Sequence, residues 1–515
     1  ARLVGAARGS RPGRRGGLGA MRPGLTGVGS TEPANERRWR LGRHRSGISL
    51  DGTWEVQLEP DGEPLPIRVP FPFEAPLSGI GRSEVHERLR YRREFEVRWD
   101  ARSLLRFGAV DWRAEVHVDG RRVGGHRGGY TGFALDLGRL APGRHELVVE
   151  VEDPAEGSQP RGKQREGGGI WYTRTTGIWQ PVRLEAVPDD YVTNWHVEPS
   201  GEVRVETARP TGVEIDAAPV ERTWDTDDPA LFPVEIRTAG GDRVSACAWA
   251  RTVETRGGEI VVNGRARRLA GILDQQFWPG GVYAAPDEDA VRADVEAVKA
   301  MGFDLARMHV KVADARWYDW CDRLGVLVAQ DIPSSHDLST PEARDAFVRE
   351  VDEIVAQLRR HPCVVAWILF NEDWGAPPAD FQRAVVARVR AADPTRLVVD
   401  ASGWKHRGDS DLHDVHDYGD DLSRHAGDGE TPYWIGECGG VSLDAEGFSY
   451  GTVDDLAGAY GNLVGGIGDG VAGFVWTQLT DVETELNGLL TYDRRPKVDV
   501  AAIREVNDAW RRSGR

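Results

Sequence analysis

The clearest hydrophobic pattern in the chain is a run of seven apolar residues at positions 364–370, which ends directly at Asn371 and Glu372. An unbroken apolar run rich in β-branched side chains predicts a strand buried on both faces. A second apolar segment, residues 433–436, also ends on a carboxylate, Glu437. The carboxyl ends of the strands form the catalytic face of an α/β barrel, so we expect both glutamates in one cleft. Taken alone, each glutamate is explained as well by a structural role, capping the following helix or pairing with an arginine, as by a catalytic one.

From about residue 260 onward, short apolar runs alternate with segments whose apolar residues recur at helical spacing. This alternation predicts a (β/α)₈ barrel over residues 257–515. The least regular part is residues 402–414, which are polar and predict no clear helix. The eight expected strands are residues 269–273, 305–309, 326–330, 364–370, 397–400, 415–418, 433–435 and 473–478.

The preceding part of the chain has a different period. Residues 46–188 hold short alternating segments separated by Gly-rich and Pro-Gly turns, which predict an all-β sandwich. Residues 189–256 contain further strand-like segments but are short for an independent sandwich. A Gly-rich stretch at 167–169 is not placed between a strand and a helix, which excludes a phosphate-binding loop.

The carboxyl ends of the eight expected strands carry polar and aromatic side chains. Aromatic faces bind the apolar faces of pyranose rings, and amides and carboxylates bind their hydroxyls. For any single tryptophan, barrel packing explains the position as well as sugar stacking does. The candidate site residues are Asp274, Arg307, His309, Asp331, Asn371, Glu372, Trp404, His416, Tyr418, Glu437 and Trp476.

Composition narrows the function further. The net charge of −17 disfavours nucleic acid as a partner, and no apolar run approaches a membrane span. The four cysteines have no metal or redox spacing and fit reduced, buried thiols. Residues 1–45 hold eleven Arg and two Glu with no apolar periodicity, which predicts a disordered basic tail, or an extension upstream of a start at Met21. The tail has no apolar secretory centre, so we expect a cytoplasmic protein.

Several motifs resemble glycoside hydrolase family 2, the group of β-galactosidases, β-glucuronidases and β-mannosidases. The segments at 51–54, 124–130 and 176–179 resemble the family's sugar-binding, jelly-roll-like sandwich, and those at 262–264 and 269–271 resemble its entry into the barrel. Residues 189–256 resemble a truncated immunoglobulin-like domain. The resemblance runs from about residue 46 to the C-terminus.

The resemblance implies a role for each matching residue. Glu372 matches the general acid/base and is expected to hold a proton near neutrality, and Glu437 matches the ionised nucleophile. Asn371 would bind the sugar 2-hydroxyl, Arg307 and Tyr418 would orient Glu437, and Trp476 would form the floor of the sugar subsite. The implied activity is a retaining exo-β-glycosidase that acts on a terminal sugar of an oligosaccharide or glycoside. No Asn-x-Lys pattern for a sugar carboxylate is present, since Lys405 mimics it only loosely, so a neutral, β-galactosidase-like sugar is favoured.

Two alternatives stay open at this point. One is a carbohydrate-binding relative with impaired catalysis, which the short β region favours and the two glutamates disfavour. The other is a metal hydrolase that uses His413, His416 and Asp417. On a strand, however, His413 and His416 face opposite ways, so we expect no catalytic metal. The resemblance implies no required cofactor and leaves open a structural Mg²⁺ or Na⁺ and assembly into a homo-oligomer.

Overall fold

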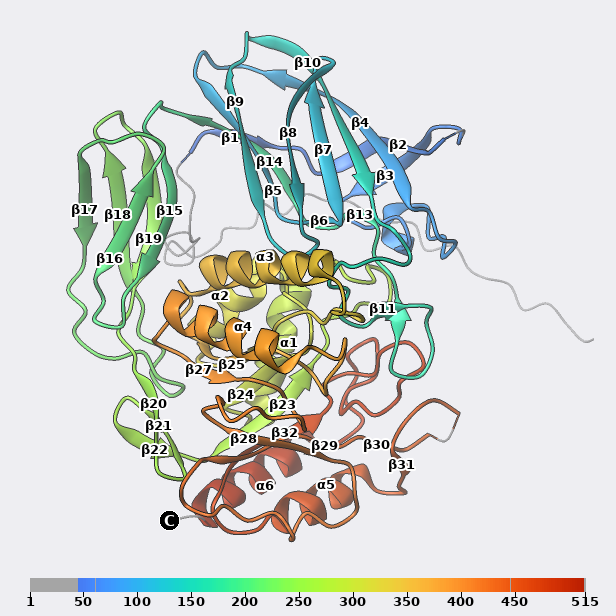
Figure 1. Cartoon of the computed structure of the whole chain (residues 1–515), viewed down its shortest axis with the longest axis vertical. Coiled ribbons are helices and arrows are strands. Elements are labelled where there is room, and N and C mark those ends of the chain that lie inside the picture. Colours follow the sequence, from blue (N-terminus) through green and yellow to red (C-terminus); the bar gives the residue numbers. More distant parts are fainter. Residues whose placement is uncertain (1–44, 61, 445, 514–515) are drawn as a thin grey trace, which may run out of the picture. The chain divides into compact units, whose positions relative to one another are not determined.

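The computed structural model describes residues 45–513 apart from 61 and 445 (Figure 1). The part of the chain it describes contains six α-helices and many short strands arranged in separate sheets. None of the helices in this part combines the length and apolar composition needed to cross a bilayer. All four cysteines are buried and free, as the sequence predicts.

The first folded region is the predicted β-sandwich. Its strands alternate between buried and exposed side chains, most clearly in β4 (Arg88–Val97), and the buried positions of the two sheets form one apolar core. The four-stranded sheet has the order β1 (Gly47–Ser49), β14 (Val182–Val187), β5 (Arg102–Phe107), β9 (Phe133–Arg139). The six-stranded sheet has the order β3 (Leu65–Val69), β2 (Gly52–Leu58), β4 (Arg88–Val97), β10 (Gly143–Glu152), β7 (Arg113–Val118), β8 (Arg121–Arg127).

Small strand pairs accompany the sandwich. They are β6 (Val110–Asp111) with β13 (Gly177–Ile178), and β11 (Gln164–Arg165) with β12 (Tyr172–Thr173). Arg45, the last residue of the predicted tail, is also part of the folded region. Its guanidinium lies 2.9 Å from Asp242 Oδ1 and 3.3 Å from Glu185 Oε2, so ending the tail at residue 45 was wrong by that residue. The rest of the predicted tail lies outside the described residues.

The second β region is short, as expected. It pairs β15 (Val192–Val197) with β16 (Val203–Thr207), and β17 (Val213–Ala217) with β18 (Phe232–Thr238) and β19 (Arg243–Ala248). These five strands are fewer than the seven of a constant-type immunoglobulin domain. A small antiparallel sheet of two successive hairpins follows, formed by β20 (Val253–Arg256), β21 (Glu259–Val262) and β22 (Arg265–Arg267). The predicted domain boundary after residue 256 therefore falls in the middle of a hairpin.

The C-terminal region is a nearly closed barrel of eight parallel strands (Figure 1). Its sheet order is β27-β26-β25-β24-β23-β32-β29-β28, so within the described chain the barrel stays open between β27 and β28. The polar, helix-free residues 402–412 connect these two strands. The strands are β23 (Leu269–Asp274), β24 (Leu305–Met308), β25 (Leu327–Asp331), β26 (Val364–Ile368), β27 (Leu397–Val399), β28 (His413–Asp417), β29 (Tyr433–Gly439) and β32 (Val471–Thr477).

Helices follow six of these eight strands. Helix α3 (Pro341–Leu358) begins after Thr340, whose side chain accepts from the Ala343 N–H, with Pro341 in the first turn. Helices α5 and α6 pack against each other, and a further short pair, β30 (Val441–Ser442) with β31 (Gly451–Thr452), follows the seventh strand (Figure 1). The helices are α1 (Glu288–Ala300), α2 (Ala315–Leu324), α3 (Pro341–Leu358), α4 (Ala379–Ala392), α5 (Leu456–Gly465) and α6 (Val500–Ser513).

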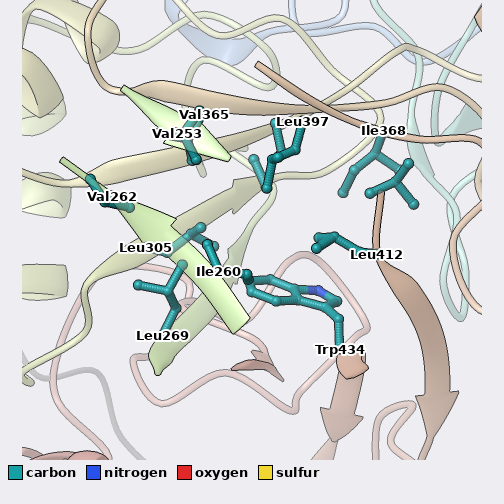
Figure 2. Close-up of a pocket in the computed structure, with 13 residues that line it drawn as sticks. Val253, Ile260, Val262, Leu269, Leu305, Val365, Ile368, Leu397, Leu412 and Trp434 are labelled. Carbon is teal, nitrogen blue, oxygen red and sulfur yellow. The ribbon is translucent and has the colours of Figure 1, made fainter. Parts of the chain in front are cut away.

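The amino-terminal end of the barrel interior is closed by apolar side chains. Figure 2 shows hairpin residues Val253, Ile260 and Val262 around the same small pocket as Leu269 and Trp434, which come from the beginnings of barrel strands. Every residue lining this pocket is apolar. This end of the barrel is therefore packed with apolar side chains, whereas the candidate site residues lie toward the carboxyl ends of the strands.

Candidate active site

Glu372 lies where the chain leaves β26 for the catalytic face. It adopts a left-handed backbone conformation, with φ of 49°, which turns the chain sharply out of the buried strand. The turn is held against the loop that follows β27. The Glu372 N–H donates to the Ser402 carbonyl at 3.3 Å, and Asn371 forms an isolated parallel β-bridge with Ser402. The Glu372 side chain is 17% exposed, so it borders both the buried site and solvent.

Glu437 lies inside β29 and is more deeply enclosed, with its side chain 7% exposed. Its Oε1 lies 3.1 Å from Nη1 of Arg307, and its Oε2 accepts a hydrogen bond from the Tyr418 hydroxyl. Burial alone would raise the pKa of Glu437, but the charges of His416 and Arg307 outweigh it and lower the pKa to about 2. Glu437 is therefore an ionised carboxylate at neutral pH.

Arg307 of β24 connects four strand ends. Its guanidinium donates to Asp331 Oδ1 at 3.0 Å, to the Asn371 side-chain oxygen at 2.9 Å and to the Ser402 hydroxyl at 3.1 Å. It also donates to the Gly436 carbonyl at 3.0 Å, beside Glu437. Because Arg307 is completely buried and so heavily bonded, it has one available geometry, which holds Glu437 and Asn371 in register.

His416 of β28 lies between the two glutamates. Its Nδ1 is 2.7 Å from Glu372 Oε1 and 3.6 Å from Glu437 Oε1. One oxygen of each glutamate and one His416 nitrogen all lie within 4.8 Å of one another. Burial opposes a charge on His416, but the carboxylates outweigh it and raise the pKa of the imidazole. A single imidazole thus links the two carboxylates.

Asp331 and His309 support the site from β25 and the end of β24. The Asp331 carboxylate accepts from Arg307, from His309 Nδ1 at 2.9 Å and from the Val310 N–H at 3.2 Å. Burial would raise the pKa of Asp331, but Arg307 and His309 outweigh it and lower the pKa. Asp331 was expected to bind substrate, yet its contacts indicate that it positions Arg307 and His309.

Trp404 lies beside Glu372. Its Nε1 donates to the Glu372 carbonyl at 3.1 Å, and its ring meets His416 edge to face at 5.8 Å between centroids. The residue is 45% exposed, so much of the indole faces solvent at the site.

Two predicted site residues point elsewhere. Trp476 is fully buried, and its ring packs against Tyr460 of α5 at 4.7 Å. The next residue, Thr477, faces the site instead, with its hydroxyl 3.4 Å from the Tyr418 hydroxyl. Side chains alternate along a strand, so Trp476 faces the helix layer and the expected sugar-stacking role was wrong.

Asp274 shows the same alternation on β23. Gln276 joins it to Asp294 of α1, with 2.9 Å from the Gln276 Nε2 atom to each carboxylate. Burial and the neighbouring Asp294 raise the pKa of Asp274. Asp274 therefore lies on the helix side of its strand, and its prediction as a substrate contact was wrong.

The structure also adds site residues that strand-end reasoning missed. Tyr450 stacks face to face on Tyr418, with 3.6 Å between ring centroids, although it lies in the loop after β29. Trp171, from the loop between β11 and β12, packs against Trp374 at 5.0 Å, and Trp374 contacts His309. The sequence shows only that Trp171 ends a Gly-rich loop. This does not indicate that the residue reaches the site or which residue it contacts there.

The histidines suggested for a metal do not converge. His413 packs against His406 and Tyr433, whereas His416 contacts Glu372. Glu372, His416 and Glu437 are close enough to share an ion, but the Arg307 guanidinium already occupies one side of Glu437. A divalent cation there would face this fixed positive charge, so the donor set does not fit a metal. A second close group, Asp319, Asp322 and His361, lies away from this site, and His361 Nδ1 is bonded to Asp322 at 2.6 Å.

Comparisons with known proteins agree with this architecture. Residues 253–417 match the family model described as "Glycosyl hydrolases family 2, TIM barrel domain". A β-galactosidase from Thermoanaerobacter pseudethanolicus is 24% identical over 381 residues, which cover 64% of this chain and 50% of the relative. A putative β-glucuronidase from Formosa agariphila is 25% identical over 355 residues, which cover 58% of this chain and 32% of the relative. The chain thus spans half or less of the length of these relatives.

Solved structures share the fold over most of the chain. A GH2 β-galacturonidase from Eisenbergiella tayi superposes with a TM-score of 0.77 at 19% identity, covering 91% of this chain and 97% of that one. A β-glucuronidase from Dictyoglomus thermophilum superposes with a TM-score of 0.76 at 18% identity, covering 90% of this chain and 97% of that one. At this identity the likeness concerns the fold alone.

Proposed function

We propose that this chain, whose barrel matches glycoside hydrolase family 2, hydrolyses terminal β-glycosides with retention of anomeric configuration. The observation that carries this proposal is the short separation of the two carboxylates, because one oxygen of Glu372 and one oxygen of Glu437 lie within 4.8 Å of each other. Retaining enzymes hold their carboxyl groups about 5–5.5 Å apart, whereas inverting enzymes leave about 6.5–9.5 Å for a water molecule. The short separation favours direct attack by a glutamate.

Glu437 is the nucleophile in this proposal. Its carboxylate attacks the anomeric carbon, forms a glycosyl ester and displaces the leaving-group oxygen. The Arg307 and His416 charges and the Tyr418 hydroxyl keep Glu437 ionised and fix its direction. These contacts account for a carboxylate that is reactive without a separate base.

Glu372 is the acid and then the base. In the first step its proton passes to the leaving-group oxygen as the glycosidic bond breaks. In the second step it takes a proton from water, whose oxygen attacks the anomeric carbon and releases Glu437. Glu372 suits both steps because it borders solvent, and the His416 Nδ1 contact holds its side chain in place.

Asn371 binds the sugar beside these groups. Its side-chain oxygen accepts from Arg307 at 2.9 Å and from the Ser402 hydroxyl at 2.8 Å. With the oxygen committed to these donors, the amide nitrogen is the group left to donate, and we assign it to the sugar 2-hydroxyl. Hydrogen bonds to this hydroxyl strengthen in the transition state.

A neutral sugar of the β-galactoside type is the favoured substrate. Two buried cations near the site, Arg307 and Lys163, already have carboxylate partners. Arg307 pairs with Asp331 and Glu437, and Lys163 lies 3.7 Å from Glu485. A sugar carboxylate would therefore find no uncommitted buried cation among these groups.

A panel of nitrophenyl β-glycosides tests the proposal directly. We expect turnover of at least one neutral β-glycoside, with the β-anomer as the first product seen by NMR. Glu437→Gln should abolish turnover, whereas Glu259→Gln, a change at an exposed residue of β21, should leave it intact. A first-formed α-anomer would contradict retention. No turnover of any glycoside would favour a carbohydrate-binding relative with impaired catalysis.

A further inference from the structure

Exposed aromatic side chains mark the two sides of the site. The large apolar residues that stay exposed in the described chain are Val85, Val213, Ile215, Trp404, Leu443 and Tyr450. The two aromatic members, Trp404 and Tyr450, are 45% and 44% exposed, and both adjoin the glutamate site. Exposed aromatic surface next to a reactive centre is typical of ligand-binding surfaces.

Trp404 belongs to the Glu372 side. Its Nε1 is anchored on the Glu372 carbonyl at 3.1 Å, and its ring meets His416 at an interplanar angle of 67°. The preceding Gly403 has a φ of 76°, a turn that lets the indole lie over the Glu372 loop. The anchor restricts rotation of the indole while leaving much of it accessible.

Tyr450 belongs to the Glu437 side. It stacks on Tyr418 with an interplanar angle of 8°, and the Tyr418 hydroxyl donates to Glu437. Burial and the nearby charges of Glu437 and Glu372 raise the pKa of Tyr450. The two exposed aromatics are therefore associated with different glutamates.

We propose that Trp404 is the platform for the leaving group, and that it takes a flat ring such as a second pyranose or an aryl group. The inference rests on the proposed function, in which Glu372 protonates the leaving-group oxygen and Glu437 bonds to the retained sugar. Groups packed on Glu372 then contact the departing part of the substrate, and groups packed on Glu437 contact the part that stays. Tyr450 accordingly serves the retained sugar.

This division has a kinetic consequence. The leaving group departs after the first step, so stacking on Trp404 contributes to formation of the glycosyl enzyme and is absent when water hydrolyses it. By microscopic reversibility the same surface binds any sugar acceptor that replaces water. Tyr450 contacts the sugar throughout, so it affects both steps whatever the leaving group.

Acceptor partitioning tests the proposal without depending on the overall rate. The glycosyl enzyme is formed from a nitrophenyl glycoside, and transfer to glucose, to methanol and to water is measured by product analysis. Trp404→Ala should lower the glucose-to-water ratio about tenfold and leave the methanol-to-water ratio unchanged, because methanol has no ring to stack. Trp404→Phe, which retains a flat ring, should recover most of the glucose transfer.

The matched comparison is Tyr450→Ala, which should slow hydrolysis but leave the glucose-to-methanol ratio near that of the wild type. Equal loss of glucose and methanol transfer in Trp404→Ala, or no change in either, would overturn the proposal. Thermal unfolding of each variant separates these outcomes from misfolding. A wild-type protein that turns over no glycoside would instead refute the proposed function.

Discussion

The Nη1 atom of Arg307 lies 3.1 Å from Oε1 of Glu437, although 130 residues separate them in the chain. Both side chains are withdrawn from solvent, the arginine at 0% and the glutamate at 7% exposure. The pair joins the second barrel strand to the seventh. The attraction within a buried ion pair is offset by the cost of desolvating both charges, so the pair adds little to stability. Its main effect is to keep the Glu437 carboxylate ionised and correctly oriented.

The assignment of the two glutamates predicts different rescue by azide. In Glu437→Gly no glycosyl ester forms, and azide entering the vacated space should give the α-glycosyl azide. In Glu372→Ala an activated aryl glycoside still forms the ester, and azide, which needs no general base, should release the β-glycosyl azide. NMR of the products reads the configuration.

The wild-type protein without azide is the control for the rescue experiment. Products of exchanged configuration would mean that the two glutamates have exchanged roles. Restored turnover in neither variant would argue against catalysis by this pair.

We expect the Tyr418 hydroxyl to contribute to the catalytic rate and not to the stability of the fold. Tyr418→Phe removes one hydrogen bond to the charged Glu437 while leaving a ring to stack on Tyr450. Such a bond corresponds to about a 10- to 100-fold fall in kcat. The melting temperature should stay near the wild-type value. A large drop in melting temperature with kcat per folded molecule unchanged would show a structural role only.

Glu350 of α3 predicts an unusual pH dependence of stability. Its Oε1 accepts from the Gly129 N–H at 2.7 Å, while Oε2 is buried with no partner in the described chain. Burial raises the pKa of Glu350 well above its usual value, and Glu353 and Asp111 add to this. The folded protein therefore retains this proton at pH values where the unfolded chain has lost it, and stability falls as the pH rises above about 4.5.

Replacing Glu350 with glutamine removes that pH dependence. Glu350→Gln should be more stable than the wild type by about 1–2 kcal/mol at pH 8, with the difference shrinking toward pH 5, as measured by urea unfolding. Glu353 offers a control of opposite sign, because His126 and Thr131 bond to it and its pKa is lowered despite partial burial. Glu353→Gln should destabilise at neutral pH, and the loss should fade as the pH falls through the lowered pKa.

The ion pairs of Arg45 predict how far the chain can be truncated from its N-terminal side before stability is lost. Its guanidinium pairs with the buried carboxylates of Asp242 and Glu185. Arg45→Met should cost about 3 kcal/mol, because it leaves these carboxylates without their cation. Deleting residues 1–44 should leave the free energy of unfolding unchanged, since the predicted tail has no apolar periodicity to bury. A deletion of 1–44 as damaging as Arg45→Met would show that upstream residues contribute to the fold.

Much of the architecture was predictable from the sequence because local periodicity and local chemistry specify it. The seven-residue apolar run before Asn371, the Thr340-Pro341 helix start and the alternation in β4 all express rules that act over a few residues. The same reasoning placed Glu372 and Glu437 at strand ends, and the barrel topology brings those ends together. The weak helix signal at 402–414 likewise corresponds to the stretch between β27 and β28, where the barrel is not closed.

What the tertiary structure decided is which way each side chain faces and what it meets. Strands β23 and β32 are buried along their whole length, so hydrophobicity does not distinguish the barrel interior from the helix layer. For this reason the predicted facing of Asp274 and Trp476 was wrong, and both side chains lie on the helix side of their strands. Tyr450 and Trp171 reach the site from loops whose paths depend on packing between distant segments. The local sequence determines that successive side chains of a strand alternate between two faces. Which face points to the barrel interior is decided only when the neighbouring strands and helices pack against the strand.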